Sequence, residues 1–330
     1  MVSNNPSLVS VVTPVYNGAN YIRECIESVQ AQSYQNWDYS IVDNCSTDGT
    51  PEIVEEYASR DSRIRLHGND KFVRVIENYN RAFRQISPES KYCKVVAADD
   101  WLYPKCLEKM VVLAEENPTA AFIGAYGFNG TKVLWQGLPS TITIANGRAL
   151  CRSRLLGGPY VFGTPSSLLI RSDIIRSRYG FHNEANLHAD SEACMEFLEQ
   201  NDFGFVHEIL TFQRSREDSM SSFSREFETY LPWTLYELLT YGPKYLEEKE
   251  LSRRVTEHMW CYYRYLGEQC FKRGRREMWK FHKAKLQSVG CPLKYSRLVV
   301  HAVSWLLDSI VNTHLAGALR HLRGLPQIKS

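Results

Sequence analysis

Short apolar runs alternate with amphipathic segments along the first 130 residues of the chain. Near-continuous apolar runs rich in Val and Ile predict strands that are covered on both faces. The segments between them place apolar residues three or four positions apart, which is typical of helices with one buried side. Because the loops between them are short, the alternation predicts βαβ units and a mostly parallel sheet. The predicted strands are 8–16, 37–43, 64–66, 92–98 and 120–128, and the predicted helices begin near 20, 51, 72 and 104.

The pattern changes in the second half of the chain. A turn at Asn129-Gly130 predicts a hairpin between the strand at 120–128 and residues 132–136. Residues 137–166 are rich in Gly, Pro and Ser and predict loops around a short helix. After about Phe223, helical segments rich in Tyr, Trp, Arg and Lys dominate. We therefore predict an α/β domain over 1–223 and a helical C-terminal region over 224–330. Within 137–223 we also expect strands at 167–171 and 203–212 and a helix at 187–200.

The most apolar segment of the C-terminal region is LVVHAVSWLLDSIV, residues 298–311. A helix lying on a membrane surface has this pattern, and so does a helix packed in a core. His301, Ser304 and Asp308 interrupt a continuous lipid-facing stripe, which slightly favours core packing. Basic residues flank the segment on both sides: Lys294, Arg297, Arg320 and Arg323.

Composition places the protein among soluble globular chains, with 44% apolar and 23% charged residues in 330. A formal net charge of +2 gives no case for nucleic acid as the main partner. The nine scattered cysteines form no CxxC, which favours free thiols in a reducing compartment. No signal peptide and no run of about 18 apolar residues is evident. We expect a cytoplasmic protein, either free or peripheral on the cytoplasmic face of a membrane.

Two adjacent carboxylates, Asp99 and Asp100, follow the apolar run Val95–Ala98 directly. Open α/β sheets bind ligands at the carboxyl ends of their strands, which is where this pair is expected. Neighbouring negative charges repel, so a cation, a basic side chain or water should compensate them. A divalent metal that carries a phosphorylated ligand is one interpretation, because hard cations take carboxylate oxygens. A solvated strand end or a helix cap before Pro104 is the other.

Four motifs in this order resemble glycosyltransferase family 2, the inverting enzymes with the GT-A fold. They are SVVTPVYNGANYIRECIESVQAQSY at 10–34, IVDNCSTDGT at 41–50, VVAADD at 95–100, and Ala189-Asp190 followed by HEILTFQRS at 207–215. The resemblance covers about residues 8–220, and its first two motifs are the most specific. It implies a Rossmann-like α/β fold with a mostly parallel central sheet flanked by helices, followed here by a helical appendage.

The resemblance also implies a nucleotide site. In the family, the Thr-Pro-x-Tyr segment and the Asp after the second strand hold the uracil of a UDP-sugar. An aromatic ring can stack on the base, and a carboxylate can accept the imide hydrogen. The polar loop 46–49 is expected to fix loop geometry and cap a helix rather than touch substrate. The implied nucleotide-binding residues are Thr13, Pro14, Tyr16, Asp43, Arg74, Ala98 and Asp99.

The metal motif departs from the family pattern of Asp-x-Asp. Ala97 stands at the first carboxylate position, which leaves Asp99 as the expected ligand of Mn²⁺ or Mg²⁺ and Asp100 as a second contact. Loss of the first carboxylate would weaken donor affinity. His207 and His188 are weak candidates for a third ligand, because a lone His is more often structural.

The family places an Asp at the start of the helix that lines the acceptor cleft, and Asp190 matches that position. As general base, it would take the proton of an attacking hydroxyl, and burial would strengthen it. A helix cap is the alternative role for Asp190, and Glu192 is the fallback base. Further phosphate or acceptor contacts are implied at Lys71, Thr164, Ser166, Arg214 and Arg216.

The sequence thus predicts a metal-dependent inverting glycosyltransferase of polysaccharide biosynthesis. It would move a sugar from a UDP-sugar to a hydroxyl of a glycan or lipid-linked saccharide. A non-catalytic nucleotide-sugar-binding subunit is an alternative, motivated by Ala97. A sugar-phosphate nucleotidyltransferase is disfavoured, because TPVYNGAN has a single Gly and no Lys. The sugar, the acceptor and the oligomeric state stay open.

Overall fold

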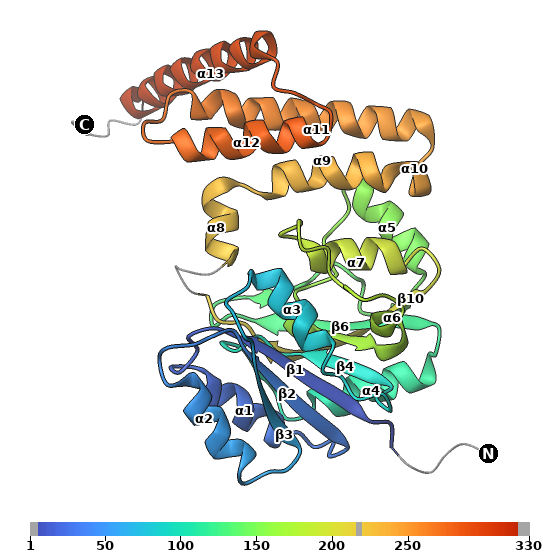
Figure 1. Ribbon diagram of the computed structural model, residues 1–330. Helices are drawn as coiled ribbons and strands as arrows, with labels where there is room; N and C mark the ends of the chain where they lie inside the picture. The colour runs from blue at the N-terminus through green and yellow to red at the C-terminus, as the bar shows by residue number, and fades with distance from the viewer. Residues whose placement is uncertain (1–5, 216–219, 323–330) are drawn as a thin grey trace. The chain divides into compact units, whose positions relative to one another are not determined.

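The computed structural model of the chain describes residues 6–215 and 220–322, and the side chains of 312–322 are left aside. The chain divides into two compact units, residues 1–217 and 218–330. In the first unit, helices and strands alternate as the periodicity predicts (Figure 1). Its helices are α1 (Ile22–Gln30), α2 (Thr50–Ala58), α3 (Val75–Phe83), α4 (Cys106–Glu116), α5 (Gly147–Leu155), α6 (Ser172–Arg176) and α7 (Ala189–Phe197).

One ten-stranded sheet organises this unit, in the order β3-β2-β1-β4-β9-β6-β10-β5, with β7 on β6 and β8 on β10. Strands β3, β2, β1 and β4 are parallel, and β9 separates them from the parallel pair β6 and β10. The predicted mostly parallel sheet is confirmed. The bounds are β1 Val9–Val15, β2 Trp37–Asp43, β3 Ile64–Gly68, β4 Tyr92–Val95, β5 Trp101–Leu102, β6 Ala120–Phe128, β7 Val133–Leu134, β8 Ile144–Ala145, β9 Leu168–Arg171 and β10 Asp202–Phe212.

Alternation along β1 assigns its two faces. Val9, Val11 and Val15 belong to a core cluster that also contains the buried side of α1 and of α4. Ser10 faces the other way and accepts a hydrogen bond from the backbone of Ser87, just after α3. Period-two alternation in a buried strand therefore separates α1 and α3 onto opposite faces of the sheet.

Three local features differ from the expectations. The fourth strand ends at Val95 rather than at residue 98, so Val96–Ala98 form a bend before the two aspartates. The brief strand predicted at 167–171 exists as β9, but it runs antiparallel between β4 and β6. The two-residue strand β5 was not expected, since its Trp101-Leu102 pairs only with the far end of β10.

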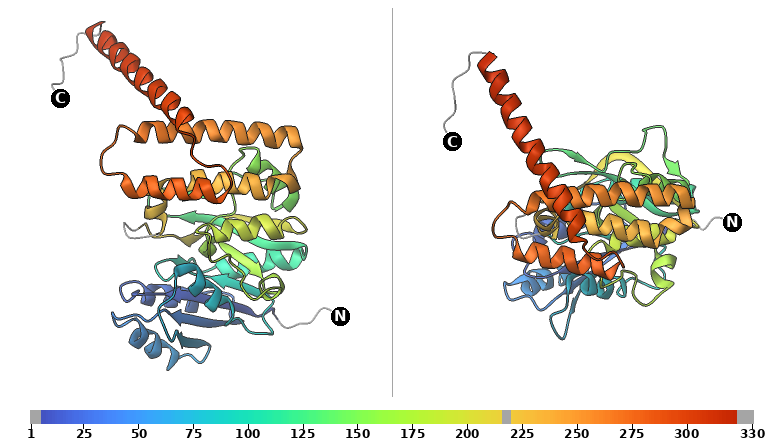
Figure 2. Two further views of the ribbon diagram at one scale, coloured as in Figure 1. Left: turned by 45° about the horizontal axis from the view of Figure 1, so that its top comes forward. Right: turned by 90° about the horizontal axis from the view of Figure 1, so that it is seen from above.

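The second unit is helical throughout its described residues (Figure 2). None of the described helices combines the length and apolarity that crossing a bilayer requires. The nine cysteines all lie among the described residues, are free thiols, and include five buried ones. The helices are α8 (Met220–Phe227), α9 (Tyr230–Thr240), α10 (Gly242–Tyr245), α11 (Glu248–Gln269), α12 (Arg276–Ser288) and α13 (Tyr295–Leu322).

Candidate active site

The carboxyl ends of β1, β2 and β4 meet at one edge of the sheet. Val15 is paired with Asp43, and its carbonyl accepts the backbone N–H of Asn44 at 2.9 Å. On the other side of β1, the N–H of Val96 donates to Val12 at 3.0 Å. The loop after β1 also reaches the metal motif: a Cβ added to Gly18 would lie 2.6 Å from Val15 and 3.6 Å from Ala98. Only glycine fits at position 18. The strand pairings and this close approach place the predicted site residues that follow β1, β2 and β4 at one edge of the sheet.

An exposed aromatic pair stands at this edge. The rings of Tyr16 and Phe72 meet edge to face with centroids 4.9 Å apart, and the residues are 51% and 59% exposed. Isolated apolar rings are uncommon on a soluble surface next to a polar site, and a planar base can stack on them. Tyr16 was expected here from the sequence, whereas Phe72, from the loop between β3 and α3, was not.

Asp43 offers an unused acceptor atom beside this edge. Its side chain is 5% exposed, and Oδ2 accepts the backbone N–H of Ser46 at 3.0 Å. The second oxygen, Oδ1, is buried and has no hydrogen-bond partner. A buried acceptor without a partner costs free energy, so its retention needs an explanation such as a ligand donor.

The polar loop 46–50 holds the loop after β1 in place. The N–H of Asn17 donates to Ser46 Oγ at 2.8 Å, and the N–H of Ala19 donates to Asp48 Oδ2 at 3.0 Å. Asp48 Oδ1 also accepts the Thr50 hydroxyl at the start of α2. These contacts agree with the expected structural role of the loop.

An asparagine network positions the loop that carries Phe72. Asn44 is buried, donates to the carbonyl of Val73 at 2.8 Å and accepts the N–H of the same residue at 2.9 Å. Lys71 and Arg74 flank this fixed point and are exposed. Their charges are therefore available to an anionic ligand at the same edge.

Asp99 and Asp100 lie in the turn after β4, and Arg214 from the end of β10 closes over it. The backbone N–H of Arg214 donates to Asp100 Oδ1 at 3.0 Å, and its Nε donates to the carbonyl of Asp99 at 3.2 Å. The guanidinium lies over the rings of Tyr21 and Trp101, at 4.9 and 5.3 Å. Burial, and next the charge of Asp99, raise the pKa of Asp100 to about 7.

Ser166 supports the aspartate turn from inside the protein. It is 1% exposed, and its Oγ accepts the N–H of Ala97 at 3.0 Å. Its carbonyl accepts Nζ of Lys94 at 2.6 Å, and Lys94 is fully buried on β4. The predicted phosphate or acceptor contact at Ser166 is thus a buried support in this structure. Thr164, next to it, has a buried hydroxyl without a partner.

Thr13 also faces the core rather than the edge. It is fully buried, its hydroxyl donates to the carbonyl of Val96 at 2.7 Å, and Tyr39 OH lies 2.8 Å away. Its side chain therefore ties β1 to the bend after β4 and does not face a nucleotide. Pro14 is buried one residue before the end of β1. Arg216 lies outside the described residues.

Asp190 opens α7, and α3 lies in its electrostatic surroundings. The pKa of Tyr79, on α3, is raised by burial and then by the charges of Asp100, Asp99 and Asp190. Tyr79 was not singled out from the sequence. The loop between α6 and α7 is held to α3 by Asn80, which accepts the backbone N–H of His182 at 2.8 Å.

The surroundings of Asp190 suit a general base. Burial raises its pKa to about 6, although the N–H of Ser191 donates to Oδ1 at 2.8 Å. Ser191 Oγ lies 2.6 Å from Tyr160 OH, which also donates to the carbonyl of Gly163. Glu192, by contrast, is 4% exposed and accepts hydrogen bonds from Asn183 and Asn186, so it orders the preceding loop. The fallback base role for Glu192 is not supported by this placement.

The histidines weighed as a third metal ligand do not gather at the aspartates. His207 uses both ring nitrogens, with Tyr126 OH at 2.9 Å and the carbonyl of Ile142 at 2.8 Å. His188 is buried before α7. Within residues 6–215 and 220–322, no group of three or more His, Cys, Asp or Glu could hold a metal. The aspartate pair therefore has no third residue of these types grouped with it among the described residues.

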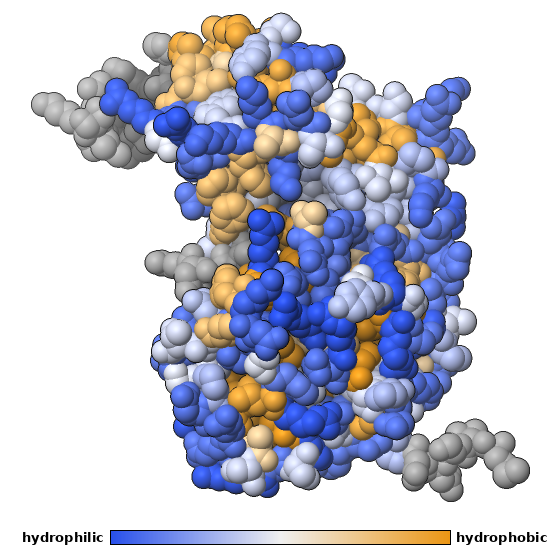
Figure 3. All heavy atoms as spheres, viewed as in Figure 1, coloured by the Kyte–Doolittle hydropathy of each residue, from blue (hydrophilic) through white to orange (hydrophobic). Residues whose placement is uncertain are grey.

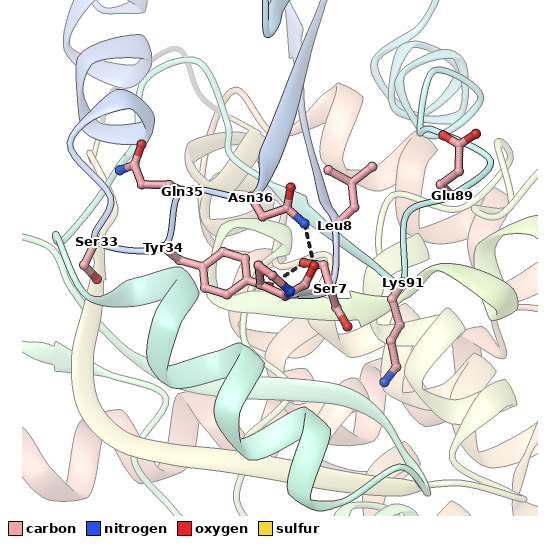
Figure 4. Close-up of a pocket in the computed structure, with 9 residues that line it drawn as sticks. Ser7, Leu8, Ser33, Tyr34, Gln35, Asn36, Glu89 and Lys91 are labelled. Carbon is pink, nitrogen blue, oxygen red and sulfur yellow. Dashed lines mark hydrogen bonds between the residues drawn. The ribbon is translucent and has the colours of Figure 1, made fainter. Parts of the chain in front are cut away.

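A cavity of about 870 Å³ lies at the opposite end of the sheet (Figure 4). It is lined by residues that precede β1, β2 and β4, among them Leu8, Tyr34 and Lys91. Tyr34 OH donates to the carbonyl of Ser7 across it. Since ligands of open α/β sheets bind at the carboxyl ends of strands, this cavity is separate from the candidate active site.

Comparisons with known proteins agree with this architecture. A family profile described as "Glycosyl transferase family 2" matches residues 10–178, just over half of the chain. EpsE of Bacillus subtilis (strain 168), which is named as a glycosyltransferase, is 27% identical over 238 residues, covering 69% of this chain and 79% of EpsE. Glycosyltransferase GlyG of Streptococcus pneumoniae serotype 4 is 30% identical over 119 residues, covering 36% of this chain and 39% of GlyG.

Solved structures share the fold at low sequence identity. The structure of S. aureus TarS 1–349 in complex with UDP-GlcNAc has a TM-score of 0.62 at 18% identity, covering 97% of this chain and 93% of that one. The mannosyltransferase PcManGT from Pyrobaculum calidifontis, in complex with GDP-Man and Mn²⁺, has a TM-score of 0.54 at 13% identity, covering 93% and 88%. The fold is that of GT-A glycosyltransferases. The chain belongs to glycosyltransferase family 2, and the protein is a glycosyltransferase.

Proposed function

We propose that the protein is a metal-dependent inverting glycosyltransferase that takes its sugar from a UDP-sugar. The acceptor is a hydroxyl group of a glycan or lipid-linked saccharide, and Asp190 is the general base. The observation that carries the proposal is the unpartnered Oδ1 of Asp43, which lies at the sheet edge shared by Tyr16 and Asp99. The family membership makes a nucleotidyltransferase the weaker explanation of the same edge.

Uracil fits the unused atoms at this edge. Its imide N–H would donate to Oδ1 of Asp43, which removes the cost of a buried acceptor without a partner. Its ring would stack against the aromatic pair of Tyr16 and Phe72. The TarS structures that resemble this chain were solved with UDP and UDP-GlcNAc, which supports a uridine donor for this protein.

The aspartate turn fits a divalent cation such as Mn²⁺ or Mg²⁺. Two adjacent carboxylates supply hard oxygen ligands, and a cation would offset the burial and the repulsion that raise the pKa of Asp100 to about 7. Asp99 and Asp100 would hold the ion, with the diphosphate as a further ligand. The ion would supply charge stabilisation for the departing UDP. Lys71 and Arg74 are exposed near the same edge and would add positive charge for the phosphates.

Asp190 completes the reaction. The acceptor oxygen forms a bond to the anomeric carbon while the bond from that carbon to the UDP oxygen breaks on the opposite face, which inverts the configuration. The acceptor proton passes to the Asp190 carboxylate. Burial raises the pKa of this carboxyl to about 6, which brings it closer to the working pH and improves it as a base.

Free cysteines and the absence of a spanning helix among the described residues are compatible with a cytoplasmic site of action. Nucleotide sugars for polysaccharide biosynthesis would then be used on that side of the membrane. The sugar is chosen by contacts beyond the uridine, which the residues above do not define.

A nucleotide-sugar screen tests the proposal. UDP release is measured with UDP-, GDP- and CDP-sugars in Mn²⁺, with wild type, Asp190→Asn and the control Asp173→Asn, whose carboxylate is exposed at the start of α6. We expect one UDP-sugar to be hydrolysed or transferred, Asp190→Asn to lose about 10²–10⁴-fold in rate, and the control to match wild type. Near-full turnover by Asp190→Asn would show that another group is the base. Preference for GDP- or CDP-sugars would contradict the uridine site.

A further inference from the structure

Helix α13 uses one side to pack within the second unit. Leu298 is buried, and the ring of His301 stacks on Tyr263 with centroids 6.0 Å apart. A Cβ added to Gly267 of α11 would lie 2.8 Å from the backbone at Ala302, so the two helices approach closely there. Figure 2 (right) shows α13 lying across α11. The core packing favoured by the sequence therefore applies to this side only.

The other side of α13 is apolar and uncovered. At about 100° per residue its exposed apolar side chains span an arc of roughly 140°. Figure 3 shows hydrophobic residues gathered over α13 at the top of the view. A helix that is apolar on nearly all sides is normally covered on all of them, and exposed apolar patches of this kind mark interaction sites. We name as the outer face of α13 the residues Val299, Val300, Val303, Leu306, Leu307, Ile310 and Val311.

Aromatic side chains extend the apolar surface onto α11 and the turn that follows it. Trp260 is about half exposed and lies 5.9 Å from the ring of His301. Phe271 is about half exposed and stacks on Trp305 of α13 at 5.1 Å. Trp side chains such as those of Trp260 and Trp305 are enriched at the boundary between lipid head groups and acyl chains.

The part of the chain that leads into the outer face is rich in basic residues. Residues 264–311 contain ten Lys and Arg against three Asp and Glu. Lys294 and Arg297 are exposed where α13 begins. Asp308, the acidic residue of α13, lies 3.7 Å from the guanidinium of Arg264, which offsets its charge. Apolar residues flanked by basic ones fit a surface that is apolar below and anionic at its head groups.

We propose that the outer face of α13 binds the surface of an anionic membrane. The apolar side chains enter the boundary of the acyl chains, and Lys294 and Arg297 contact lipid phosphates. A second copy of the chain fits less well, because the apolar arc is wider than a coiled-coil seam and two positively charged segments would repel. This inference goes beyond the proposed function, since lipid binding needs neither UDP nor Asp190.

Vesicle co-sedimentation of the full chain tests the surface. Wild type is expected to bind phosphatidylcholine vesicles that contain phosphatidylglycerol and to bind pure phosphatidylcholine weakly. Val303→Ser/Leu307→Ser removes two apolar side chains of the outer face without changing charge, and should weaken binding by about tenfold. Lys294→Gln/Arg297→Gln should reduce the preference for anionic vesicles by a similar factor.

A matched control distinguishes binding through the outer face of α13 from non-specific binding by exposed apolar side chains. Val112→Ser/Ile142→Ser removes two exposed apolar side chains from the first unit and should bind vesicles as wild type does. Equal binding by wild type and Val303→Ser/Leu307→Ser would overturn the proposal. The proposal would also be overturned if wild type did not bind vesicles and instead formed dimers that Val303→Ser/Leu307→Ser abolishes. A protein that transfers sugar normally yet ignores vesicles overturns this surface alone and leaves the proposed function intact.

Discussion

The backbone N–H of Arg214 donates a 3.0 Å hydrogen bond to Oδ1 of Asp100. Through this bond, the end of β10 holds the turn that follows β4, although the two residues are far apart in sequence. Ser166 supports the same turn by accepting the backbone N–H of Ala97, and the buried ammonium of Lys94 donates to the carbonyl of Ser166. The turn that carries the two aspartates is therefore fixed by contacts from two other segments, the residues that follow β10 and the loop at Ser166.

Removal of the buried ammonium should weaken this support. In Lys94→Met, the carbonyls of Ser166 and Leu168 lose their donor, at 2.6 and 3.1 Å in wild type. We expect the free energy of unfolding to fall by about 2–4 kcal/mol, since the loss of two buried hydrogen bonds outweighs the relief of removing a buried charge. Urea unfolding measures it. Lys91→Met, which breaks an exposed pair with Glu115, should cost at most about 1 kcal/mol. Equal costs in both variants would mean that Lys94 is dispensable.

The rate of transfer should fall at acidic pH because Asp190 must be ionised to accept a proton. Burial raises its pKa to about 6, so protonation increases and kcat decreases as the pH falls through that value. At a pH one unit below the pKa, about a tenth of the carboxyl remains ionised. A pH profile of kcat checks this, with Asp190→Asn as a control whose residual rate should lack this fall. A profile that stays flat down to pH 4 would contradict the base assignment.

The burial that raises the pKa of Asp190 also predicts that stability depends on pH. Stability should fall as the pH rises, whereas the rate of transfer should increase. The folded state binds the Asp190 proton more tightly than the unfolded chain, so ionisation destabilises the fold as pH rises from about 4 through 6. Asp190→Asn should therefore be more stable than wild type by about 3 kcal/mol at pH 8. The difference should vanish below pH about 4. Chemical unfolding at both pH values measures it, and a variant that is less stable at pH 8 would show that Asp190 is a structural cap.

Phe72 should contribute to nucleotide affinity without contributing to stability. Its ring is 59% exposed and touches Tyr16 edge to face. Phe72→Ala should weaken UDP binding by about 3–10-fold, as expected for the loss of one aromatic contact, with little change in Tm. Tyr179→Ala, at an exposed aromatic residue before α7, is the control and should leave UDP binding unchanged. Unchanged affinity in Phe72→Ala would remove the ring from the site.

Asp43 should determine which nucleobase the site accepts. In Asp43→Asn, one oxygen can still accept the N–H of Ser46, while the amide presents a donor where Oδ1 was. UDP affinity should fall by about 10–100-fold, because the uracil imide would then meet another donor. CDP, whose ring nitrogen is an acceptor at that position, should lose less or gain. Calorimetric titration with both nucleotides decides. Equal losses for UDP and CDP would give Asp43 a structural role only.

The strands and the polar residues at their ends could be predicted from the sequence, because local patterns determine them. The apolar runs located β1, β2 and β4, and their polar ends located Tyr16, Asp43 and Asp99 at one edge. The side chain of Thr13 lies in the core, and the sequence carried a signal for this: period-two alternation puts it on the same face of β1 as Val11 and Val15, which is the core face.

Other residues had no local signal. Phe72 reaches the site because Asn44 holds Val73 through two hydrogen bonds across nearly thirty residues. Lys94 interrupts an apolar strand, and only the insertion of β9 beside β4 gives its ammonium the carbonyls it needs. Tyr79 had no local signal, because the carboxylates that raise its pKa come from distant segments, Asp99 and Asp100 after β4 and Asp190 on α7. Such long-range contacts follow from the tertiary fold and not from spacing.

The central claim is that one edge of the sheet grips UDP through Asp43 and through a cation held by Asp99. Isothermal titration of the wild-type chain with UDP, in Mn²⁺ and again in EDTA, tests it most directly. We predict saturable binding in Mn²⁺ that weakens at least about tenfold in EDTA, and the same weakening for Asp99→Ala in Mn²⁺. No binding in Mn²⁺, or equal affinity with and without the cation, would contradict the account.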